Sequence, residues 1–62
     1  MDGEYFRNQL NDTEFISAIA WSCDLATVRI QGREGGVMLT KEQLENTIQM
    51  LNNVLEKVKS YE

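Results

Sequence analysis

The stretch TKEQLENTIQMLNNVLEKVKS, residues 40–60, predicts one long amphipathic helix. No glycine or proline interrupts it. Thr40 is followed three residues later by Gln43, which matches the capping box, in which each of the two side chains bonds the other residue's backbone N–H. We therefore expect the helix to begin directly after Thr40 and to continue to about Ser60.

The apolar residues of this helix form more than one row. The main row has the alternating spacing of four and three residues that a helical face requires, and it comprises Leu44, Ile48, Leu51, Leu55 and Val58. A second row beside it holds Thr47, Val54 and Tyr61, with Met50 beyond. This width exceeds a two-position coiled-coil seam and is typical of a helix that lies on a sheet or on a broad partner surface.

Residues 25–31 alternate between two faces and predict a strand, with Ala26, Val28 and Ile30 on one side. The segment GREGG at 32–36 then has the composition of a hairpin connection, and we expect a positive φ at one of its last two glycines.

Residues 37–39 follow as a short apolar segment that runs into the helix cap, which favours a third strand there. In this arrangement Val28, Ile30, Val37 and Leu39 share the face that the helix covers.

The sequence pattern of the N-terminal half leaves its secondary structure open. Residues 13–23 fit a strand or a helix by periodicity, and their aromatic and β-branched content favours the strand. Residues 1–12 fit either a frayed or extended arm or a short helical turn that buries Phe6 and Leu10. The expected fold is one α+β domain over 1–62: a small antiparallel β-meander of two or three strands within 13–39, followed by one long C-terminal amphipathic helix over 40–60.

Composition argues against catalysis and cofactors. The 62 residues include no histidine, the commonest general base, and the single Cys23 offers neither an internal disulfide nor a metal-ligand cluster. The glycine-rich segment lacks the spacing of a phosphate-binding loop. We expect no enzyme activity, no cofactor and no metal, and we interpret Cys23 as a small packed residue.

Charge and hydropathy limit the classes of partner that the sequence predicts. The net charge of −4 makes nucleic-acid binding an unfavoured interpretation. No apolar run approaches 18 residues, so no membrane partner is expected. A lone thiol with no signal peptide predicts a cytoplasmic location.

A chain of this size buries only about 60% of its unfolded surface, and pairing with a second copy is a common remedy. We therefore expect a homodimer built largely on the 40–60 helix. Trp21 is interpreted as a core anchor in preference to an interface anchor. The candidate dimer or partner contacts are Ile48, Met50, Leu51, Val54, Leu55, Val58, Trp21, Met38 and Tyr61.

These features favour a non-enzymatic protein–protein interaction module, a small homodimeric regulator or inhibitor that binds a larger protein. The sheet face or the acidic N-terminal half would meet that protein. Small acidic chains of this kind suit bacteriophage or bacterial accessory proteins. Two alternatives remain open: a nucleic-acid-linked regulator or acidic DNA mimic, and a structural subunit of a larger assembly.

Overall fold

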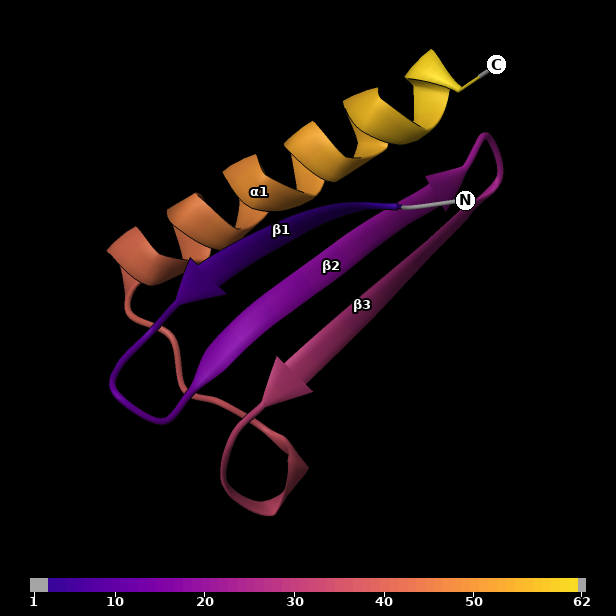
Figure 1. The fold of residues 1–62 in the computed structure, drawn as a ribbon. Coiled ribbons are helices and arrows are strands. Elements are labelled where there is room, and N and C mark those ends of the chain that lie inside the picture. The colour runs from indigo at the N-terminus through magenta and orange to yellow at the C-terminus, as the bar shows by residue number, and fades with distance from the viewer. Residues whose placement is uncertain (1–2, 62) are drawn as a thin grey trace.

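The computed structural model describes residues 3–61 and shows an α+β fold (Figure 1). Three antiparallel strands form one sheet in the order β1-β2-β3, and a single long helix follows. The elements are β1 (Glu4–Gln9), β2 (Phe15–Ser22), β3 (Leu25–Gln31) and α1 (Lys41–Ser60). The expected fold class, a small meander followed by a long C-terminal helix, is confirmed.

Strand β1 occupies the N-terminal segment, so the helical turn expected there is wrong, and the extended conformation is found as a strand of the sheet and not as an arm. Phe6 pairs with Ala18 of β2, and Asn8 pairs with Ile16. The Asn11 carboxamide oxygen accepts the backbone N–H of Thr13 and of Glu14, which reverses the chain between the strands. The pairing with β2, a long-range contact, decides the conformation of a segment whose local pattern is weak.

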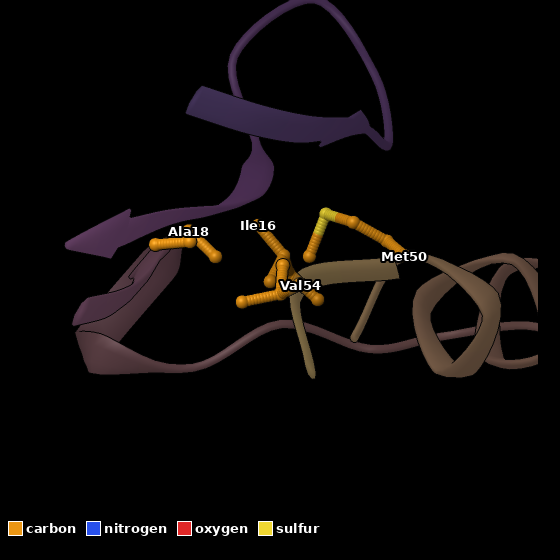
Figure 2. Close-up of a cluster of buried hydrophobic side chains, with 5 residues drawn as sticks. Ile16, Ala18, Met50 and Val54 are labelled. Atoms are coloured by element: carbon orange, nitrogen blue, oxygen red, sulfur yellow. The ribbon is translucent and has the colours of Figure 1, made fainter. Parts of the chain in front are cut away.

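The residues of β2 confirm the strand interpretation and supply the floor of the core. Ile16, Ala18 and Ala20 lie on the side of the sheet that faces the helix, and all three are buried. Met50 and Val54 of α1 pack against them (Figure 2). Because the side chains of the two alanines are small, the helix can approach the sheet closely. No large side chain in the described chain is fully buried, so the core is thin.

The connection between β3 and α1 differs from the expected hairpin. Arg33–Gly35 forms a 3-10 turn, and residues 37–39 belong to no strand. The helix begins near the end of β1, where the Gln43 side chain donates a hydrogen bond to the Leu10 carbonyl. The chain therefore has to cross the end of the sheet and cannot run back beside β3. Val37 and Leu39 still pack against the core, as expected, but β3 is left as an edge strand.

Gly35 has a φ of 80°, which confirms a positive φ within the glycine-rich segment. We expect Gly35→Val to lower the free energy of unfolding by more than about 1 kcal/mol, because a β-branched residue is strained there. Gly36 is the matched control, since its backbone is extended (φ −145°) and a Cβ would meet open space. Urea titration measures both variants, and equal midpoints would contradict the assigned strain.

The capping box at the start of α1 is formed as expected. The Thr40 hydroxyl accepts the Gln43 backbone N–H at 3.1 Å, and the Gln43 side-chain oxygen accepts the Thr40 N–H at 3.0 Å. We expect Thr40→Ala to lower the free energy of unfolding by about 1 kcal/mol. The neighbouring exposed Lys41→Ala is the control in the same urea titration. A Thr40→Ala midpoint equal to that of Lys41→Ala would mean that the cap does not stabilise the fold.

Candidate protein-interaction surfaces

The rotation of α1 about its axis decides which of its apolar residues are free. Asn8 of β1 donates a side-chain hydrogen bond to the Thr47 hydroxyl at 2.7 Å. Lys57 lies 3.6 Å from the Glu4 carboxylate of β1, and the Tyr61 hydroxyl donates to the Ala20 carbonyl of β2 at 3.3 Å. Lys57 therefore marks the side of the helix that faces β1, and Tyr61, one turn later and rotated slightly about the helix axis, marks the side that faces β2.

Further rotation about the helix axis in the same sense, from β1 past β2, leads to the main apolar row, which therefore lies on the β3 side of the helix. The row is exposed: Leu44, Ile48, Leu51 and Leu55 keep between 38% and 51% of their surface accessible. The second row is the buried one, because Thr47, Met50 and Val54 face the sheet. The helix therefore turns its longest apolar row sideways, along the flank nearest to β3.

Strand β3 presents apolar residues to the same side of the sheet. Val28 pairs with Ala18, and Ile30 pairs with Ile16, so both point toward the helix layer. They are nevertheless half exposed, at 52% and 50%, because α1 packs mainly over β1 and β2. The expectation that both lie on the helix side is correct, but the helix does not cover them.

The exposed row of the helix and the two exposed residues of β3 together form what we call the uncovered apolar surface. It consists of Leu44, Ile48, Leu51 and Leu55 of α1 with Val28 and Ile30 of β3. The outward side of the helix is different in kind, since it carries only polar exposed residues, namely Glu45, Gln49, Asn52 and Glu56. The chain thus offers one apolar flank that is bordered by a polar helix surface.

The predicted contact residues separate into distinct groups. Ile48, Leu51 and Leu55 lie together on the uncovered apolar surface. Met50 and Val54 belong to the core and are unavailable to a partner, so their assignment as interface candidates is wrong. Val58 and Tyr61 are half buried against the same core.

Two further candidates lie elsewhere. Met38 projects from the loop before the helix with 95% of its surface exposed. Trp21 is at the surface with its indole N–H donating to the Thr27 hydroxyl at 2.8 Å, so the core interpretation of Trp21 is wrong. The helix covers the opposite side of the sheet, which leaves no core on this side to receive the indole.

Sequence reasoning missed Leu44, Val28 and Ile30 as surface residues. Their apolar spacing was visible, but the spacing gives the width of an apolar face and not its rotation toward the sheet. Cys23 was also misplaced, because it is exposed in the tight turn between β2 and β3 and is not packed.

The outer face of the sheet is open and carries aromatic and basic side chains. The Arg7 guanidinium lies 3.8 Å from the centre of the Phe15 ring and donates to the side chains of Gln9 and Tyr5. A shallow hollow of about 230 Å³ lies beside them, lined by Tyr5, Phe15, Ser17, Ala18, Ile19, Thr27 and Arg29. The strand registers place no acidic residue among the lining positions, although the chain as a whole carries a net charge of −4.

A second open hollow lies between the β1–β2 turn and the loop that leads to the helix. Its volume is about 640 Å³, and its lining combines polar turn residues with Val37 and Met38.

Across residues 3–61, no helix is both long and apolar enough to span a bilayer.

Comparison with known proteins gives no relative. No protein-family model, no curated protein and no solved structure matches the chain.

Proposed function

We propose that this chain is a non-enzymatic protein-interaction module that works as a homodimer and regulates or inhibits a larger protein. The uncovered apolar surface is the observation that carries the proposal. Fully burying a leucine or isoleucine side chain is worth about 1.5–3 kcal/mol, and the chain leaves four such residues about half exposed along one side of the helix. A second protein surface that covers this flank gains about half of that free energy for each residue, because the other half of each side chain is already covered.

The two faces of the sheet suit two different partners. The helix side, with its uncovered apolar surface, suits a permanent contact, because obligate interfaces are the more apolar kind. The outer face is more polar and carries Tyr5, Arg7 and Trp21 at the surface, residue types that are enriched at protein interfaces. We assign the homodimer to the helix side and the larger protein to the outer face.

Charge indicates the chemistry of the larger partner. Arg7 and Arg29 lie on an outer face whose paired positions are otherwise neutral. An acidic patch on the partner protein would complement them, and such pairing steers association and sets specificity. This arrangement also fits a regulator that blocks an acidic surface of its target.

The experiment is affinity capture from a lysate of the native host with three baits. The unaltered chain should retain one protein, and Arg7→Glu should lose it because the outer face goes from two positive charges to no net charge. Lys41→Glu is the matched control, since it makes the same charge change at an exposed site away from the sheet face. The proposal fails if the unaltered bait retains no protein. It also fails if nuclease treatment releases the retained material, which would favour the nucleic-acid alternative.

A further inference from the structure

The exposed edge of β3 is the feature that the proposed homodimer leaves unassigned. Within residues 3–61, β3 pairs only with β2, and its other edge presents unpaired backbone N–H and C=O groups. Its seven residues contain a single charge, that of Arg29. An open strand of this kind is a template for pairing with another strand.

The opposite edge of the sheet, at β1, is protected in a way that β3 is not. Its six residues carry two charges, those of Glu4 and Arg7, and Glu4 is ion-paired with Lys57 of the helix. Charged side chains on an edge strand discourage strand addition. The apolar flank of the helix also lies on the β3 side. The β3 edge is therefore the one that a partner strand would join.

The polar outward side of the helix restricts how a second copy can approach. If the partner were stacked on top of the helix, its apolar residues would cover Glu45, Asn52 and Glu56, and the buried carboxylates would lose their hydration. A partner that arrives beside the helix, in the same layer, covers only the apolar flank. A partner that extends the sheet at β3 and places its own helix on the same face meets this condition.

The amount of exposed surface fits a second copy. The chain exposes 4709 Å². A folded monomer of 7.1 kDa is expected to expose about 4,100 Å², so the excess is about 600 Å². Two copies that each bury this excess form an interface of about 1,200 Å², which is at the lower limit of the range for specific interfaces.

The register of the pairing follows from the faces of β3. Residues that lie opposite one another in an antiparallel pair point to the same face, and a slip of one residue would place the two helices on opposite faces. Pairing about Val28 keeps both helices on one face and uses all seven residues of the strand. Pairing about Arg29 would set two arginines directly against each other, and pairing about Thr27 would leave Ile30 beyond the start of the partner strand.

We infer that two copies of this chain join through antiparallel pairing of their β3 strands about a two-fold axis at Val28. The result is a six-stranded sheet with two helices side by side on one face. Ile30 of each copy lies opposite Ala26 of the other, and the apolar rows of the two helices, each over β1 and β2 of its own copy, line the two sides of a trough above Val28. This inference rests on the homodimer of the proposed function and specifies its architecture.

Disulfide cross-linking tests the register in a full chain that carries Cys23→Ser. Directly opposite residues of an antiparallel pair have Cα atoms about 4.5–5.5 Å apart, within the range that a disulfide spans. Val28→Cys should therefore give a linked dimer on mild oxidation. Ala26→Cys alone and Ile30→Cys alone should stay unlinked, because each residue is then about 13 Å from its own copy. An equal mixture of the Ala26→Cys and Ile30→Cys chains should give a linked heterodimer.

Hydrogen exchange of the unaltered chain supplies a second measurement that needs no substitution. In the paired strand, the β3 amides that point away from β2 become protected in alternation with those already bonded to β2. A dimer by light scattering with rapid exchange at these amides, or with no link through Val28→Cys, overturns the β3 pairing and leaves the homodimer intact. A chain that remains at 7.1 kDa overturns both.

Discussion

Replacing Val54 by aspartate is expected to unfold the chain. Val54 is 4% exposed and packs with Met50 against the β2 floor (Figure 2). A chain of 62 residues has a free energy of unfolding of roughly 3–9 kcal/mol. The substitution removes an apolar contact worth about 1.5–3 kcal/mol and buries a carboxylate without a partner, which costs several kcal/mol more. The sum is comparable with the whole free energy of unfolding expected for a chain of this size.

The neighbouring Asn53→Asp is the matched control for this prediction. Asn53 is exposed on the polar side of the helix, so the same added charge stays hydrated. Circular dichroism during thermal unfolding measures both variants. Val54→Asp should show no cooperative transition, and Asn53→Asp should melt within a few degrees of the unaltered chain. A cooperative transition for Val54→Asp near that of the unaltered chain would place Val54 outside the core.

Replacing Leu55 by glutamate is expected to break the homodimer while the monomer stays folded. Leu55 keeps 49% of its surface exposed in the single chain and makes no part of the buried core. About half of the Leu55 side chain is already covered in the single chain, so each copy loses about half of a full leucine burial, about 1.5–3 kcal/mol for the two copies together. The dissociation constant should rise by a factor of about 10 to 10².

Asn52→Glu places the same charge on the outward side of the helix and is the control. Sedimentation equilibrium measures the dissociation constant of each variant, and circular dichroism reports whether the fold persists. Asn52→Glu should dimerise like the unaltered chain. Equal dissociation constants for Leu55→Glu and Asn52→Glu would remove the apolar flank of the helix from the interface.

The sequence was most informative where local contacts decide the structure. The capping box at Thr40 depends only on residues within one helical turn, and the alternation of residues 25–31 depends only on a strand having two faces. Both features were predictable for that reason. Long-range pairing was not, since β1 is held by β2 and its own residues carry no strong strand pattern.

The interaction surface was only partly predictable for a related reason. The width of the apolar arc on α1 indicated that more than one surface must cover it. Which row meets the sheet depends on the packing of Met50 and Val54 on β2, and the contacts Asn8–Thr47 and Glu4–Lys57 accompany that rotation. The rotation leaves Ile48 and Leu55 outside, a choice that apolar periodicity alone does not encode.

The mass of the unaltered chain in solution is the most direct test of the homodimer. Static light scattering over a range of micromolar concentrations should give twice 7.1 kDa, because the uncovered apolar surface is then paired. The mass should fall toward that of one chain only on strong dilution. A folded species of 7.1 kDa that does not change on concentration would contradict the homodimer and would assign the uncovered apolar surface to a different protein.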